Sequence, residues 1–255
     1  MPYIEVKGLK TNYIDEGSGE CILFLHGWGA NLETFRPVIN YFETKNRVVA
    51  LDMPGCGKTD VPQTDLNMTD YADFVNEFCK LLNVERPVIV GHSNGGRTIL
   101  KLFEQNPEYP CKKVILIDAS GIKHKRTLAA SARLFSYKTA KAVLSFRLWK
   151  KKSEPYLEKL RSHFGSSDYK NADPVMRKTL VNILAEDLKP ALPNIKVPTL
   201  IFWGSKDTDT PLSDGKTMEK LIPDSGLIVL EGAGHYSYLE KLGEFLRVSD
   251  YFING

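Results

Sequence analysis

Apolar residues follow two different patterns along this chain. In some segments they form short continuous runs, which are typical of strands buried on both faces of a sheet. In others they recur every three or four positions, which is typical of helices that pack one face on a core. The continuous runs lie at residues 21–25, 47–51, 88–90, 114–117, 199–203 and 227–230. The helical spacing lies at residues 32–42, 68–82, 99–106, 215–221 and 238–252.

The alternation of strands and helices is broken in two places. Residues 3–6 and 9–14 alternate apolar and polar side chains, which predicts an antiparallel hairpin at a sheet edge. Residues 122–193 contain no buried strand pattern, only helical ones. We therefore predict an α/β fold in which residues 1–121 and 194–255 form a mostly parallel, doubly wound sheet, and residues 122–193 form a helical lid inserted between two strands. Such an insertion would lie over the carboxyl ends of the strands, where open α/β sheets bind ligands.

Length and charge narrow the class of protein. The chain has 255 residues, enough for one large α/β domain with a sizeable core. A formal net charge of only +3 argues against a nucleic-acid partner. The sequence has no apolar signal core and no run of transmembrane length, so we expect a cytoplasmic protein without membrane contact, either a monomer or a homodimer. Its four cysteines form no Cys-x-x-Cys pair and are expected to be reduced thiols.

A serine stands at the tip of a predicted strand–turn–helix segment, in Gly91-His92-Ser93-Asn94-Gly95. This context is what makes a Gly-x-Ser-x-Gly pattern informative. The two glycines let the strand and helix backbones pass closely around a strained serine, whose hydroxyl then points out of the sheet. The alternative is a Gly/Ser-rich loop without chemistry, and we favour Ser93 as a nucleophile.

A serine hydroxyl reacts only when a base takes its proton and an acid orients that base. His235 follows the last predicted strand in Gly-Ala-Gly-His and is the candidate base. Asp207 follows the first strand after the insertion and is the favoured acid, because it gives the chain order Ser…Asp…His. Asp118 and Asp52 also end predicted strands and are reserve candidates. Asp209 is expected to be a loop or helix-capping residue.

The other four histidines receive structural interpretations. His26 and His92 lie in tight glycine-flanked turns and are expected to form hydrogen bonds near the site. His124 and His163 lie in the predicted insertion and are expected at the surface.

A tetrahedral intermediate needs two aligned N–H donors for its oxyanion. The backbone N–H of Asn94, at the start of the predicted helix, is one candidate. The glycine-lined loop 26–29 offers the other, which we assign to the N–H of Trp28. The Trp28 side chain would then line the substrate pocket, the alternative being a plain core aromatic. No His/Cys cluster has metal-ligand spacing, so we expect no metal and no organic cofactor.

Taken together, these motifs resemble the α/β-hydrolase superfamily, and within it the lidded esterase, lipase-like and carbon–carbon-bond hydrolase group. The resemblance rests on His26-Gly27-Trp28-Gly29, Asp52-Met53-Pro54-Gly55-Cys56-Gly57, Gly91-His92-Ser93-Asn94-Gly95-Gly96, Trp203-Gly204-Ser205-Lys206-Asp207…Pro211 and Gly232-Ala233-Gly234-His235…Glu240. It implies the fold and a triad of Ser93, Asp207 and His235. A serine at the nucleophile position argues against haloalkane dehalogenases and epoxide hydrolases, which carry aspartate there. Asn94 stands where members often have methionine, which makes this wall of the pocket more polar.

We therefore expect a serine hydrolase that cleaves a small or medium carboxylic ester through an acyl-enzyme. A carbon–carbon-bond hydrolase, a pyruvate-eliminating lyase, a triad-bearing signal-binding protein and an interfacial lipase are the alternatives. The lyase rests on Ser-x-Gly-Gly-Arg, which ends at Arg97, a residue that otherwise reads as a surface arginine. The many Lys and Arg residues of 122–162 are interpreted as a solvated face, with steering of an anionic substrate or contact with an acidic membrane as alternatives.

Overall fold

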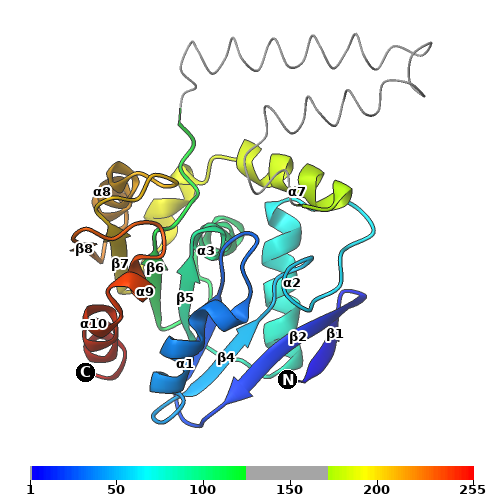
Figure 1. The fold of residues 1–255 in the computed structure, drawn as a ribbon, viewed down its shortest axis with the longest axis horizontal. Helices are drawn as coiled ribbons and strands as arrows, with labels where there is room; N and C mark the ends of the chain where they lie inside the picture. The colour runs from blue at the N-terminus through cyan, green and yellow to red at the C-terminus, as the bar shows by residue number, and fades with distance from the viewer. Residues whose placement is uncertain (1, 125–171) are drawn as a thin grey trace.

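The computed structural model of the protein describes residues 2–124 and 172–255 (Figure 1). Several predictions made for the insertion lie outside these residues. They are the helical patterns at residues 128–135, 140–144 and 156–160, the surface position of His163, and the basic character of residues 125–162.

The described residues form an eight-stranded sheet in the order β1-β2-β4-β3-β5-β6-β7-β8. Its strands are β1 (Tyr3–Val6), β2 (Leu9–Glu16), β3 (Cys21–Leu25), β4 (Arg47–Leu51), β5 (Val88–His92), β6 (Lys113–Ile117), β7 (Thr199–Gly204) and β8 (Ser225–Leu230). β1 pairs antiparallel with β2, and β2 with β4, while every other neighbouring pair is parallel. The predicted edge hairpin and the mostly parallel sheet are thus confirmed. The carboxyl ends of the parallel strands β3–β8 lie at one edge of the sheet.

Helices cover both faces of this sheet (Figure 1). They are η1 (Leu32–Phe35), α1 (Arg36–Phe42), α2 (Met68–Leu81), α3 (Asn94–Gln105), α7 (Pro174–Ala185), η2 (Lys189–Asn194), α8 (Leu212–Leu221), α9 (Ser237–Glu240) and α10 (Leu242–Asn254). Apolar residues of α2, α3, α7, η2 and α8 share one core cluster, and those of α1, α9 and α10 share the other. Two buried layers therefore sandwich the sheet, as its continuous apolar strands require.

Two helices differ from the single segments that the sequence predicts. The segment predicted as one helix at residues 32–42 begins as a 3-10 turn, which Asn31 caps by accepting a hydrogen bond from the N–H of Glu33. The last segment is divided at Lys241, whose dihedral angles of φ −124° and ψ 43° are not helical. Neither change alters which face of the segment is buried.

The end of α7, the described helix of the insertion, accepts hydrogen bonds from basic side chains. Arg97 of α3 donates from Nη1 to the carbonyls of Ile183 (2.5 Å) and Glu186 (3.1 Å). Lys123 donates from Nζ to the carbonyl of Ala185 (2.6 Å). The last carbonyls of a helix lack intrahelical donors and carry partial negative charge, so cations at this end satisfy and stabilise α7. In the described part of the chain, no helix combines the length and apolar character needed to cross a membrane.

Candidate active site

Ser93 occupies the turn between β5 and α3 with φ 50° and ψ −109°. This left-handed conformation is costly for a residue with a side chain, and it persists because the surroundings fix it. A Cβ on Gly91 would lie 2.6 Å from the Gly96 nitrogen, and one on Gly95 would overlap the carbonyl of Leu25. The two glycines are thus needed for the close passage of strand and helix that the sequence predicts. The turn leaves Ser93 half-buried.

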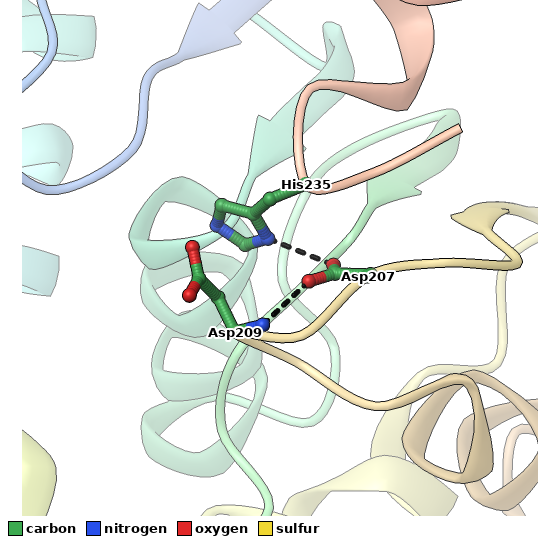
Figure 2. A group of neighbouring side chains, drawn as sticks. All are labelled: Asp207, Asp209 and His235. Atoms are coloured by element: carbon green, nitrogen blue, oxygen red, sulfur yellow. Dashed lines mark hydrogen bonds and ion pairs between the residues drawn. The ribbon is translucent and has the colours of Figure 1, made fainter. Parts of the chain in front are cut away.

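Three side chains from distant parts of the chain form a hydrogen-bonded row. The hydroxyl of Ser93 lies 3.0 Å from Nε2 of His235. Nδ1 of His235 lies 2.8 Å from Oδ2 of Asp207, as Figure 2 shows. Ser93 follows β5, Asp207 follows β7 and His235 follows β8, so the parallel strands deliver all three to the same edge. The structure brings these predicted residues together with the imidazole between the hydroxyl and the carboxylate.

The carboxylate of Asp207 is held from several sides. Oδ1 accepts the backbone N–H groups of Asp209 (2.8 Å) and Thr210 (3.0 Å), and Oδ2 accepts the hydroxyl of Thr210 (2.7 Å). Burial opposes its charge, but hydrogen bonds with His235 and Thr210 outweigh burial and lower the pKa of Asp207. The carboxylate is therefore charged and fixed in orientation at neutral pH.

The charge of Asp207 determines the properties of His235. Burial disfavours the imidazolium, yet the hydrogen bond with Asp207 and the negative charges of Asp207, Asp118 and Asp209 raise the pKa of His235 above its usual value. A raised pKa means that this imidazole takes up a proton more readily than a free histidine. That is the property a general base needs.

His26 and His92 are buried and hold neighbouring backbone, as the sequence predicts. Nε2 of His26 accepts the N–H of Met53 (2.9 Å), so its Nδ1 carries the proton and donates to the carbonyl of Gly27 (2.7 Å). Nε2 of His92 donates to the carbonyl of His235 (2.8 Å). Burial lowers the pKa of His26, and burial beside His235 lowers that of His92 to about 3. Both rings are therefore neutral, and each fixes the position of neighbouring backbone through its hydrogen bonds.

Asp118, a reserve candidate for the acid, is fully buried and forms its side-chain hydrogen bonds with Gly204 and Ser237. Its Oδ1 accepts the N–H of Gly204 (2.8 Å), and its Oδ2 accepts the N–H (3.2 Å) and hydroxyl (2.5 Å) of Ser237. Its carbonyl oxygen lies 3.1 Å from the hydroxyl oxygen of Thr210, whose single proton is directed to Asp207 at the shorter distance of 2.7 Å. Burial raises the pKa of Asp118 to about 7 in spite of these bonds. The residue thus joins the ends of β6 and β7 to the segment that follows His235.

The two residues predicted to donate to an oxyanion follow the neighbouring strands β3 and β5 at the same edge of the sheet. Asn94 is the first residue of α3 and is buried. Trp28 is half-buried and packs against the core cluster on the α2 and α3 face of the sheet. The Trp28 side chain is therefore in part the core aromatic given as the alternative. The donor roles of the two N–H groups stay predictions.

The remaining candidates have other partners. Asp52, the second reserve acid, accepts the N–H groups of Leu32 and Lys58 and pins the loop after β4. His124, expected at the surface, keeps an exposed ring but contacts the buried carboxylate of Asp214 (2.9 Å). Asp209 is in the loop before α8 and is exposed, and its side chain does not cap that helix, whose N-cap is Pro211 without a side-chain bond.

Arg97 differs from both interpretations that the sequence suggested. It is only 4% exposed, so it is not a surface residue. Its guanidinium is directed toward the carbonyls at the end of α7 and, through Nε, toward the hydroxyl of Ser120 (3.3 Å), not toward Ser93. The hydroxyl of Ser120 in turn donates to the carbonyl of Ser93 (3.2 Å).

One group of metal-ligating side chains coincides with this row. Asp207, Asp209 and His235 each place one ligand atom within 4.8 Å of the others (Figure 2). Both oxygens of Asp207 already accept hydrogen bonds, and Nδ1 of His235 faces one of them. The arrangement therefore fits proton transfer along the row better than chelation of an ion.

Sequence reasoning missed Thr210 and Ser237, whose hydroxyls bond the carboxylates of Asp207 and Asp118. A local contact of Thr210 was within reach of sequence reasoning, because an aspartate in a turn commonly bonds backbone groups a few residues on, as Asp207 does with the N–H of Thr210. Ser237 could not, because its partner lies 119 residues away in the sequence.

Comparison with known proteins gives one family match. The family model described as "alpha/beta hydrolase fold" matches residues 20–242, which is most of the chain. The 2-hydroxy-6-oxo-6-phenylhexa-2,4-dienoate hydrolase of Comamonas testosteroni is 27% identical over a gapped alignment of 271 positions, which covers 98% of this chain and 93% of that protein.

Two solved structures agree with that match. Est816, described as an N-acyl homoserine lactone degrading enzyme, superposes with a TM-score of 0.78 at 25% identity and covers 99% of this chain and 100% of its own. The esterase EaEST from Exiguobacterium antarcticum superposes with a TM-score of 0.77 at 25% identity and covers 99% of both chains.

Proposed function

The chain belongs to the α/β-hydrolase family, and on that premise we propose that it is a serine hydrolase that cleaves a small or medium carboxylic ester through an acyl-enzyme. The single observation that carries the proposal is the row of hydrogen bonds from Ser93 through His235 to Asp207, with distances of 3.0 Å and 2.8 Å. The two esterase-like neighbours support the choice of an ester bond.

In the first step the hydroxyl oxygen of Ser93 attacks the ester carbonyl carbon while Nε2 of His235 takes the hydroxyl proton. The Asp207 carboxylate accepts the Nδ1–H and stabilises the imidazolium that forms. Collapse of the tetrahedral intermediate breaks the bond to the leaving alcohol, which receives the proton from Nε2. The acyl group remains on Ser93.

The developing oxyanion is proposed to accept the backbone N–H groups of Asn94 and Trp28. Two features of the fold favour this assignment. The N–H groups in the first turn of α3 have no intrahelical acceptor, so they are free for an anion. The carbonyl of Gly27 is held by His26, which fixes the peptide plane that carries the N–H of Trp28.

In the second step water attacks the acyl-enzyme, with His235 removing its proton and then returning the proton to Ser93. The chain's own groups supply every proton transfer in both steps. The proposal includes residues 122–193 as a cap over this edge, with residues 1–121 and 194–255 as the core. The described helix α7, which is fastened to α3 outside the sheet, supports that division.

The test is turnover of 4-nitrophenyl esters of increasing acyl length by the wild type, Ser93→Ala and Ser225→Ala. Ser225 lies at the opposite end of the sheet, where its hydroxyl bonds the carbonyl of Glu219, and it is the matched control. We expect Ser93→Ala to lose turnover by at least about 10³-fold. Near wild-type turnover in Ser93→Ala would refute the proposal, since the control shows what the loss of a distant serine hydroxyl does.

A second candidate is hydrolysis of a carbon–carbon bond beside a ketone, supported by the relative from Comamonas testosteroni, whose name gives it as a hydrolase of 2-hydroxy-6-oxo-6-phenylhexa-2,4-dienoate, a keto acid without an ester bond. The same three side chains would serve. Product analysis with a vinylogous diketone acid and with a simple ester decides between the two, because the higher kcat/KM shows which class of bond this site cleaves better. Repeated turnover with either substrate would argue against a signal-binding protein, which would react once.

A further inference from the structure

We infer that Asp209 sets the charge preference of this site, so that the hydrolase prefers uncharged esters to esters that carry a carboxylate near the scissile bond. The inference rests on the proposed function, because it concerns the substrate class of the same site. It assigns a role to a residue that takes no part in the row of hydrogen bonds.

The position of the Asp209 side chain follows from its backbone. The N–H of Asp209 donates to Oδ1 of Asp207 (2.8 Å), which turns the loop around that carboxylate. Figure 2 shows the side chain beside the imidazole of His235, across the ring from Asp207. Asp209 is exposed while Asp207 is buried, so Asp209 is the carboxylate on the solvent side of the base.

The charge of Asp209 is not cancelled within the described residues. One of its oxygens lies within 4.8 Å of a ring nitrogen of His235, and Figure 2 draws no hydrogen bond or ion pair between the two side chains. Across residues 2–124 and 172–255, no lysine or arginine forms an ion pair with it. Arg97 is the first basic residue after Ser93 in the sequence. It is buried and donates its hydrogen bonds to the carbonyls at the end of α7. An entering substrate therefore meets a net negative group beside the base.

The groups facing His235 come from three further elements. They are Asp207 from the loop between β7 and α8, Asp118 from the end of β6, and the neutral ring of His92 from β5. Asp207 and Asp118 are buried and bonded to other groups, so a substrate does not contact them. Of the three carboxylates near His235, namely Asp207, Asp118 and Asp209, only Asp209 is exposed, so it is the one that a substrate approaches from solvent.

This placement has two consequences of opposite sign. The carboxylate stabilises the imidazolium that forms whenever Ser93 attacks, which helps every substrate. It also repels a substrate carboxylate, which hinders anionic substrates alone. A charge about 5 Å away in water-like surroundings is worth about four-fold in a rate or binding constant.

The experiment measures kcat/KM for 4-nitrophenyl hexanoate and for the mono-4-nitrophenyl ester of adipic acid, which match in chain length and differ by one carboxylate. The variants are Asp209→Asn and the control Asp224→Asn. Asp224 is an exposed residue just before β8, at the far end of the sheet. Asp209→Asn is expected to lower kcat/KM for the hexanoate by about four-fold and to leave that for the adipate nearly unchanged, because the lost stabilisation of the imidazolium and the relieved repulsion offset each other there, while Asp224→Asn leaves the ratio of the two unchanged. A structural defect would lower kcat/KM for both substrates by the same factor, and an unchanged ratio of the two overturns the inference.

A second measurement does not depend on the choice of ester. A neutral fluorophosphonate labels an activated serine, and its rate of labelling falls at low pH as the base becomes protonated. The midpoint of this fall is expected at lower pH in Asp209→Asn than in the wild type, and an unchanged midpoint overturns the inference. Failure of the proposed function looks different: labelling and turnover would then persist in Ser93→Ala.

Discussion

Arg97 offers a direct test of how the segment between β6 and β7 is held on the sheet. The side chain is buried and donates to the carbonyls of Ile183 (2.5 Å) and Glu186 (3.1 Å). Burial lowers the pKa of Arg97 to about 10, so the guanidinium is still charged at neutral pH and its hydrogen bonds are charge-assisted. Arg97→Met keeps an unbranched apolar stem of similar length and removes the donors.

The expected loss of stability follows from these contacts. A hydrogen bond to a charged group contributes about 1.5–3 kcal/mol, and two carbonyls lose such a donor. The cost of burying the guanidinium is removed at the same time, which offsets part of the loss. We expect the free energy of unfolding to fall by about 3 kcal/mol, which lowers the melting temperature of a chain of this size by roughly 6–12 °C.

Urea denaturation of Arg97→Met measures the change, and Lys178→Met is the matched control. Lys178 lies on α7 itself with a side chain 74% exposed and a long contact of 3.9 Å to Asp65, so its replacement is expected to change stability by less than about 0.5 kcal/mol. Equal stability of the two variants would show that the Arg97 bonds do not hold α7. A second anchor, the ion pair of Lys101 with Glu186 at 2.5 Å, would then be the one to remove.

Three further substitutions test the site and its turn. Asp207→Asn should lower kcat/KM by about 10³- to 10⁴-fold. It should also move the acid limb of the pH–rate profile to lower pH, because the carboxylate raises the pKa of His235. An unchanged midpoint of that limb would contradict this. Thr210→Val removes the 2.7 Å bond to Asp207 and should lower kcat/KM by about ten-fold with little change in KM, measured by steady-state kinetics. Gly95→Ala forces a Cβ onto the carbonyl of Leu25 and should cost more than about 2 kcal/mol in urea denaturation; stability equal to the wild type would mean that the turn can relax.

The parts of the fold that sequence predicts well are those set by local pattern. The run Cys21–Leu25 is buried at four of its five positions and forms β3 within the predicted limits. The capping box of Asn67 and Asp70 sets the start of α2 close to where the apolar spacing begins. In both, the information lies within a few residues of the element itself.

The environment of Arg97 could not be predicted because it depends on partners about 86 to 89 positions away. Nothing in the residues around Arg97 indicates that the end of α7 lies beside it. The same holds for Asp118, whose strand-end position suggested an acid but whose hydrogen-bond partners, Gly204 and Ser237, come from two later segments. Sequence order placed Ser93, Asp207 and His235 at one edge because parallel strands converge there, and such geometry follows from fold class alone.

The network around Asp118 implies that stability and activity respond to pH in opposite directions. Burial raises the pKa of Asp118 to about 7, and the pKa of His235 is also raised above its usual value. A group whose pKa is raised on folding stabilises the protein below its unfolded pKa, and this contribution is lost as the pH rises through the folded pKa. For Asp118 the window runs from about pH 4 to about 7, and at 1.36 kcal/mol per unit the contribution is on the order of 4 kcal/mol.

As the pH rises, the proposed base His235 becomes neutral and Asp118 becomes charged. The protein therefore gains activity over the same pH range in which its free energy of unfolding falls. Urea denaturation between pH 5 and 8 should show the free energy of unfolding falling as pH rises, while kcat/KM rises over the same range. Asp118→Asn should flatten the fall in stability, because its amide does not titrate, and should retain the bond from the N–H of Gly204 through its oxygen. An equal slope in wild type and variant would mean that Asp118 is charged throughout this range, with its three hydrogen bonds outweighing its burial.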